Sequence, residues 1–170
     1  MISLMQEPLR PQIAGAVLLV ASVFGLNAGT LGQDQTAVIA KDAIVARKTM
    51  DTLSDKMDVI EAAIAVGTEL NLDEGHANAD VISVLLMAFP HLFPPSTNEW
   101  KPNVDRNPAT DTYASPDVWT KFGDFYQQAT AASKAAFHAS RADDEATFKA
   151  AIARLHAGCN ACHAAYLKSN

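Results

Sequence analysis

Between positions 39 and 64, where hydrophobic and polar residues are mixed, the hydrophobic residues recur at alternating intervals of three and four positions. They are Ile39, Ala43, Ala46, Met50, Leu53, Met57, Ile60 and Ile64. This spacing places them on one face of a helix and is typical of seams in left-handed helical bundles. Asp34 or Thr36 can cap the start of the helix, because either side chain accepts a hydrogen bond from a free backbone N–H group. We therefore predict an amphipathic helix that weakens at Gly67.

A similar period returns in three later segments, which predict three more helices. The second helix follows Asp73-Glu74-Gly75 and ends at Pro90. The third begins with Ser115 as its cap and Pro116 as its first residue. A polar turn at residues 140–144 leads into the fourth helix, whose hydrophobic positions are Phe148, Ile152, Leu155, Cys159, Cys162 and Tyr166.

Six prolines interrupt this pattern between the second and third helices: Pro90, Pro94, Pro95, Pro102, Pro108 and Pro116. Because proline breaks a helix interior, the segment predicts a crossover, with Phe93, Trp100 and Tyr113 as its anchors. The other two connections are short, and short connections join antiparallel neighbours. The fold class that we predict is all-α, an antiparallel four-helix bundle with a long proline-rich crossover between helices 2 and 3.

The N-terminus has a different character. Arg10 precedes an apolar run over residues 13–26, and small residues follow at Ala28 and Gly32. This order predicts a secretory signal peptide over residues 1–28, with cleavage as late as 32 as the alternative, and a single domain over 33–170. The run is short for a bilayer span, which needs about 20 apolar residues, and an uncleaved anchor is the other interpretation. We expect no membrane association after cleavage.

Charge narrows the classes of partner. The formal net charge is −6, and 49% of the 170 residues are hydrophobic. An acidic chain of this kind is a poor match for nucleic acid or for an anionic membrane surface. We therefore expect protein partners and no nucleic acid.

The only two cysteines lie in the sequence Cys159-Asn160-Ala161-Cys162-His163. Cys-x-x-Cys-His is the attachment signature of c-type haem. Positions i, i+3 and i+4 share one face of a helix, so both thiols and the imidazole can reach one porphyrin. A redox pair, half a zinc site and a plain disulfide are the alternatives. The motif predicts one covalent haem c, with Cys159 and Cys162 as thioether anchors and His163 as the proximal iron ligand. Export fits this cofactor, because covalent attachment takes place outside the bacterial cytoplasm.

A four-helix chain with this motif on its last helix resembles class II cytochrome c, the cytochrome c′ family. Three further segments match the family pattern: Arg47-Lys48-Thr49-Met50 on the first helix, the proline turn at residues 89–95, and Pro116 to Trp119. One departure concerns the arginine that usually follows the aromatic residue after the motif. Here Tyr166 is followed by Leu167, and the next cation is Lys168.

The export signal predicts a periplasmic protein. We expect it not to be an enzyme, because a haem enzyme such as a peroxidase needs distal acid–base residues and the sequence offers no distal histidine–arginine pair. Six-coordinate members of the family place a methionine from the first helix on the iron and carry single electrons between redox partner proteins. Five-coordinate members leave the site open and bind small gases such as NO or CO. We predict the first kind, with Met50 as the sixth ligand, Arg47 as a haem propionate contact, and a homodimer through the first two helices.

Several assignments stay open at this stage. Met50 also fits the core, because methionine packs well into irregular gaps. Aligning the family's helix-one arginine with Arg47 shifts the frame and offers Asp51 in place of Met50. Met57 and Met87 are weaker alternatives for the sixth ligand. His156 either borders the haem edge or is an ordinary surface histidine.

Overall fold

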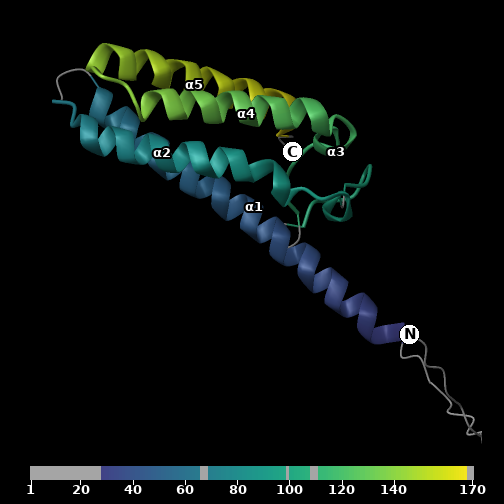
Figure 1. The fold of residues 1–170 in the computed structure, drawn as a ribbon. Coiled ribbons are helices and arrows are strands. Elements are labelled where there is room, and N and C mark those ends of the chain that lie inside the picture. Colours follow the sequence, from purple (N-terminus) through teal and green to yellow (C-terminus); the bar gives the residue numbers. More distant parts are fainter. Residues whose placement is uncertain (1–27, 66–68, 99, 108–110, 168–170) are drawn as a thin grey trace, which may run out of the picture.

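The computed structural model describes residues 28–65, 69–98, 100–107 and 111–167, with the backbone alone for residues 28–40. Its long helices are α1 (Ala28–Ile64), α2 (Leu72–Ala88), α4 (Phe122–Ala139) and α5 (Glu145–Tyr166). They form the predicted all-α bundle (Figure 1). The predicted signal peptide, up to residue 27, lies outside the described residues. No helix among the described residues is long and apolar enough to cross a membrane.

The helix boundaries differ from the sequence prediction at three points. α1 begins at Ala28, upstream of both Asp34 and Thr36. Asn71 caps α2 by accepting the Glu74 N–H at 3.2 Å, so the helix starts before the turn that we predicted as its entry. The predicted third helix is divided into α3 (Asp117–Thr120) and α4, because the backbone of Lys121 leaves the helical region at φ −120° and ψ 37°.

The predicted Ser115 cap is also wrong. No side chain caps α3, and the Ser115 hydroxyl instead donates to the carbonyl of Ala165 at 3.5 Å. Ser115 therefore joins the end of the crossover to the last turn of α5. The predicted crossover is confirmed, and it contains two short 3-10 helices, η1 (Phe89–Leu92) and η2 (Pro95–Thr97).

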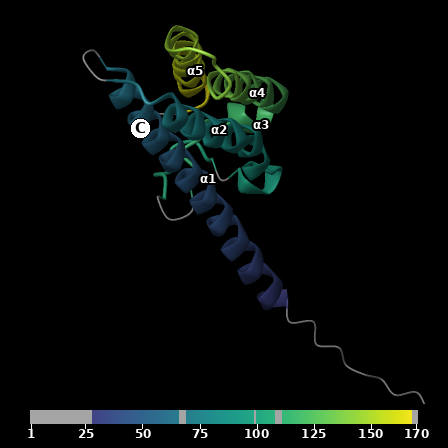
Figure 2. The same cartoon turned by 60° about the vertical axis from the view of Figure 1, so that its left-hand side comes forward.

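Three pairs of long helices pack extensively against each other. α1 packs on α2, α2 on α4, and α4 on α5, so that α1–α2 and α4–α5 form two antiparallel pairs (Figure 2). The main core lies between them and includes Leu53, Ile60, Ile82, Phe148, Ile152 and Leu155. Residues of α1 and α5 border a common cavity.

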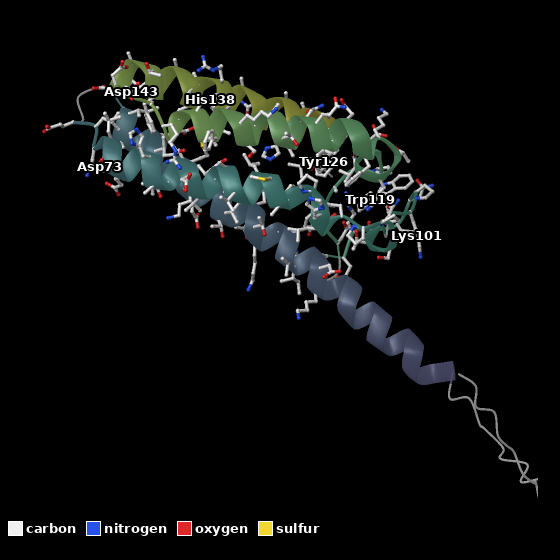
Figure 3. The ribbon with its side chains drawn as sticks, in the orientation of Figure 1. Asp73, Lys101, Trp119, Tyr126, His138 and Asp143 are labelled. Carbon is white, nitrogen blue, oxygen red and sulfur yellow. The ribbon has the colours of Figure 1, made fainter. Side chains whose placement is uncertain are left out.

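A second buried cluster lies at the crossover end of the bundle. Its members are Ala46, Phe89, Phe93, Ala114, Val118, Phe125 and Tyr166. The indole N–H of Trp119, labelled in Figure 3, donates to the carbonyl of Pro94 at 3.2 Å and so fixes the crossover to α3. Met50 packs against both clusters, which places it at the junction between the main core and the crossover end.

Candidate haem site

The Cys-x-x-Cys-His motif lies in the last two turns of α5. Asp144 caps this helix by accepting the N–H of Thr147 at 2.7 Å, and this hydrogen bond lowers the pKa of the Asp144 carboxyl. Cys159 and Cys162 are half-buried and are not bonded to each other. His163 is exposed. The helix therefore presents the three groups on one side, as their spacing predicts.

Two cavities lie against the motif. The first has a volume of about 560 Å³ and extends toward the crossover; the second has a volume of about 380 Å³ and extends along α1 and α5. Both volumes fall in the range of about 300–1,000 Å³ that is usual for ligand pockets. The two cavities share the residues Met50, Asp51, Phe89, Cys162 and His163. We call this shared zone the central wall.

α1 contributes two residues of the central wall, Met50 and Asp51, and α5 contributes the motif residues Cys162 and His163. Met50 is half-buried there and Asp51 is exposed, so the structure brings both candidates of the alternative alignments to the wall. Met57 borders the second cavity only. Met87 is 57% exposed on α2 and borders neither cavity. As a candidate sixth ligand, Met50 is therefore better placed than Met57, which borders one cavity, and than the exposed Met87.

Arg47 provides a test of whether the first cavity suits haem. Its side chain borders this cavity, as does that of the exposed Lys48. The Arg47 Nε atom is buried and has no hydrogen-bond partner among the described residues. A buried unpaired guanidinium nitrogen costs free energy unless an acceptor is supplied. A haem carboxylate is such an acceptor, so the residues present fit the group.

The walls of the first cavity are aromatic and apolar. Phe89, Phe93, Phe125 and Tyr166 line it, with ring centroids 5.1 to 6.2 Å apart where the rings meet. Such walls suit the flat hydrophobic face of a porphyrin. None of these four aromatic residues could be assigned to the cavity from the sequence. They come from the end of α2, the crossover, α4 and α5, and only the folded bundle brings these elements together.

The thiols are held in their neutral form. Burial raises the pKa of Cys159, and burial followed by the charges of Cys159 and Asp124 raises the pKa of Cys162 to about 11. Reactive redox pairs depend on a lowered thiol pKa, so this environment does not match the redox-pair alternative. Among the described residues, no group of three or more His, Cys, Asp or Glu side chains is arranged to hold a metal ion.

Two histidines can now be placed. His156 borders the second cavity, and its Nε2 lies 3.8 Å from a carboxylate oxygen of Glu61 on α1, with over half of the imidazole exposed. His76 is half-buried on α2, with its ring 5.8 Å from that of Phe148.

Three residues of the crossover, Thr112, Tyr113 and Ala114, also border the first cavity. Tyr113 was predicted as an anchor of the crossover but not as a cavity residue. The one local feature that could have indicated an ordered structure around Tyr113 is the pair of opposite charges at Arg106 and Asp111, which form an ion pair. Nothing in the sequence pattern shows that the crossover residues next to this ion pair border the same cavity as the motif.

Comparison with known proteins agrees with this geometry. The cytochrome c′ family model matches residues 42–167. The cytochrome c′ structure from Thermochromatium tepidum is 22% identical, with a TM-score of 0.67 over 77% of this chain and 97% of that one. A cytochrome c′ with an unusual ligand-controlled dimer dissociation is 19% identical, with a TM-score of 0.64 over 77% and 97%.

A third structure, the nitric oxide complex of a mutant cytochrome c′ from Alcaligenes xylosoxidans, is 20% identical, with a TM-score of 0.63 over 76% and 97%. No curated protein sequence matches the chain. At these identities the solved structures show a common fold. The family model covers most of the chain, and the chain therefore belongs to the cytochrome c′ family of haem proteins.

Proposed function

We propose that this protein is a periplasmic c-type cytochrome that carries single electrons and has no catalytic reaction of its own. Cys159 and Cys162 would hold one haem c covalently, and His163 would bind its iron. Haem supplies a one-electron iron couple, whose potential the protein adjusts through axial ligands, burial and nearby charge. The exposed imidazole of His163 and the half-buried thiols on the same helix support these roles.

Met50 is the residue that we propose as the sixth ligand. The observation that carries the electron-transfer function is its position on the central wall, where it borders both cavities together with Cys162 and His163. A thioether ligand from Met50 would keep the coordination nearly constant between the two oxidation states, and this would suit a carrier. Arg47 would pair with a propionate through its unpartnered Nε.

Gas binding is the second candidate function. The apolar aromatic walls of the first cavity could enclose a small diatomic ligand if the sixth position were open. A related cytochrome c′, from Alcaligenes xylosoxidans, has been solved as a nitric oxide complex. The two candidates differ in one property, which is whether a protein side chain occupies the sixth position.

The absorption spectrum of the ferrous protein, before and after carbon monoxide, separates them. The proposed carrier is low-spin and binds carbon monoxide slowly, because the gas must first displace the Met50 thioether. A high-spin ferrous spectrum with immediate uptake of carbon monoxide would favour the gas-binding function. A purified protein without a haem spectrum would contradict both.

We further propose a homodimer through α1 and α2. Val81, Val84 and Met87 are exposed at 41%, 57% and 57% on α2, and Val59 is exposed at 42% on α1. Apolar groups of this size on adjacent helices are stabilised when a partner covers them. A related cytochrome c′ is a dimer whose dissociation a ligand controls.

A further inference from the structure

Tyr113 has an unusual backbone conformation. Its φ is 57°, in the left-handed region that residues with a bulky side chain rarely adopt. Asn103 is the other non-glycine residue with a positive φ in the described part of the chain, but asparagine tolerates this region well. A tyrosine held there costs free energy and persists only where surrounding contacts fix it; such residues often occur at ligand sites.

The contacts that fix Tyr113 come from a buried ion pair within the crossover. The Arg106 guanidinium binds both carboxylate oxygens of Asp111, with Nε–Oδ2 and Nη2–Oδ1 distances of 2.7 and 2.6 Å. Their side chains are only 11% and 12% exposed. Asp111 Oδ1 also accepts the N–H of Tyr113 at 2.8 Å, and the Arg106 Cζ lies 5.6 Å from the centre of the Tyr113 ring.

The same ion pair fixes the crossover to the haem-binding helix. Arg106 Nη2 donates to the carbonyl of Ala114 at 2.8 Å, and Ala114 forms a bridge with Leu167. The Ser115 N–H donates to the carbonyl of Tyr166 at 2.7 Å. The backbone on either side of Tyr113 is therefore held in place, on one side by Asp111 and on the other by the end of α5.

This arrangement puts Tyr113 on the wall of the first cavity, which Arg47, Cys162 and His163 also border. We propose that Tyr113 closes the crossover side of the haem site against water, and that Arg106 and Asp111 are the positioning residues that hold it there. The inference rests on the proposed function, because it requires haem to be bound. Excluding water raises the reduction potential, since a low-dielectric surrounding disfavours the more highly charged ferric form.

A buried ion pair can select one conformation of the chain without adding to the free energy of unfolding. That property suits a pair whose role is to fix Tyr113. The alternative is that Arg106 and Asp111 act only as charges near the haem, or only as a structural link within the crossover. Each alternative predicts a different pattern of reduction potentials.

The first test measures the reduction midpoint of the full-length holoprotein by spectroelectrochemistry in Tyr113→Gly and Tyr113→Phe. Glycine adopts a left-handed backbone without strain, so Tyr113→Gly removes the ring and keeps the fold. At a fixed applied potential we expect its ferrous-to-ferric ratio to fall by roughly three- to tenfold, where tenfold corresponds to about 59 mV for one electron. Tyr113→Phe keeps the ring and should stay within about twofold of the wild type.

The second test separates positioning from charge. If the pair acts through Tyr113, Arg106→Gln and Asp111→Asn both lower the potential, as Tyr113→Gly does. If the two residues act as charges, removing the cation lowers the potential and removing the carboxylate raises it. Asp105→Asn is the matched control, because Asp105 is exposed on the same crossover and takes no part in the ion pair.

The inference is wrong if Tyr113→Gly has the wild-type midpoint, or if Arg106→Gln and Asp111→Asn shift it in opposite directions. If either ion-pair variant fails to fold, Tyr113→Gly still decides the result. A melting temperature that falls with no change in potential assigns the pair a structural role only and overturns the proposal. A wild-type protein without haem contradicts the proposed function, and the spectrum alone shows this before any variant is compared.

Discussion

The hydroxyl of Tyr166 donates a hydrogen bond to a carboxylate oxygen of Asp124, joining the last turn of α5 to the first turn of α4. Gln128 donates to the same oxygen at 3.1 Å. Tyr166 is buried, and its ring lies 5.2 Å from that of Phe125. This link fixes the turn that follows His163. The carboxylate of Asp124 therefore lies near the motif. In the family pattern, by contrast, an arginine usually follows the aromatic residue that Tyr166 represents here.

Tyr166→Phe should destabilise the protein, because it removes a partly buried hydrogen bond to a charged group, and such bonds contribute about 1.5–3 kcal/mol. The free energy of unfolding, measured in urea near neutral pH, is expected to fall by that amount. Tyr126→Phe is the matched control. Tyr126 lies on the same helix as Asp124 and is 39% exposed, so this variant should keep almost the whole free energy of unfolding.

The same hydrogen bond predicts a pH dependence. Burial, and then the contact with Asp124, raises the pKa of Tyr166 above its usual value of 10.0. Above pH 10 the unfolded chain releases the phenol proton while the folded chain retains it, so stability is full below pH 10 and falls as the pH rises further. The wild type should lose stability more steeply in this range than Tyr166→Phe. Parallel alkaline losses in the two proteins would contradict the prediction.

Gly75→Ala should destabilise the bundle. A Cβ atom at Gly75 would lie 2.8 Å from Cζ of Phe148, which is fully buried in the main core. Overpacking of this kind costs about 1–3 kcal/mol, measurable as a lower denaturation midpoint. Gly123→Ala is the control, because a Cβ there meets nothing within 4 Å and alanine favours the helix by up to about 1 kcal/mol. Equal midpoints for Gly75→Ala and the wild type would show that Phe148 can move aside.

Much of this fold follows from short-range patterns. Alternating steps of three and four predict α1 from Ile39 to Ile64, and the polar turn at residues 140–144 predicts where α5 begins. Cys159, Cys162 and His163 are three, and then one, residue apart, so a helix alone brings them together. For these elements, local spacing determines both the structure and the position of the motif.

The rest depends on contacts between distant residues. Tyr166 and Asp124 are 42 positions apart, and no local pattern pairs them. The break at Lys121 and the closure of the first cavity by Tyr113 likewise depend on how the crossover packs. Arg106 and Asp111 are close enough in sequence to suggest an ion pair, but only the folded crossover places that ion pair beside α5.

Haem attachment provides a direct test of the motif. The haem should stay with the polypeptide in a denaturing gel, because two thioether bonds hold it. A Cys159→Ala, Cys162→Ala double variant should lose the haem on denaturation. The wild-type chain and the variant are compared by haem staining of the same gel. Haem that leaves the denatured wild type, or remains on the double variant, would contradict covalent attachment at these residues.

The proposed dimer predicts that Val84→Asp dissociates the protein. A carboxylate at this exposed position on α2 would have to lose its hydration at the interface, which is costly when no partner charge is present. Val104→Asp is a close control, because Val104 is 58% exposed on the crossover, outside α1 and α2. Sedimentation should show a dimer for the wild type and Val104→Asp, and a monomer for Val84→Asp. A wild type that is monomeric at high micromolar concentration would refute the dimer.

Met50→Ala is the variant that decides between the two candidate functions. Loss of the proposed thioether ligand should give a high-spin ferrous spectrum and faster uptake of carbon monoxide. The reduction potential should fall, because a thioether favours ferrous iron. Truncating a half-buried methionine that packs against both core clusters also removes apolar contacts, at a cost below the roughly 2–5 kcal/mol that a fully buried methionine contributes to the free energy of unfolding.

Met57→Ala separates the loss of a ligand from the loss of packing. Met57 packs against the main core on the same helix and borders the second cavity but not the first. We expect this variant to lose stability comparably, while its spectrum and its rate of carbon monoxide binding stay as in the wild type. If instead the wild type is already high-spin and takes up carbon monoxide at once, and both variants keep that spectrum, Met50 only packs the core. In that case the sixth position is open, and gas binding replaces electron transfer as the function that the site supports.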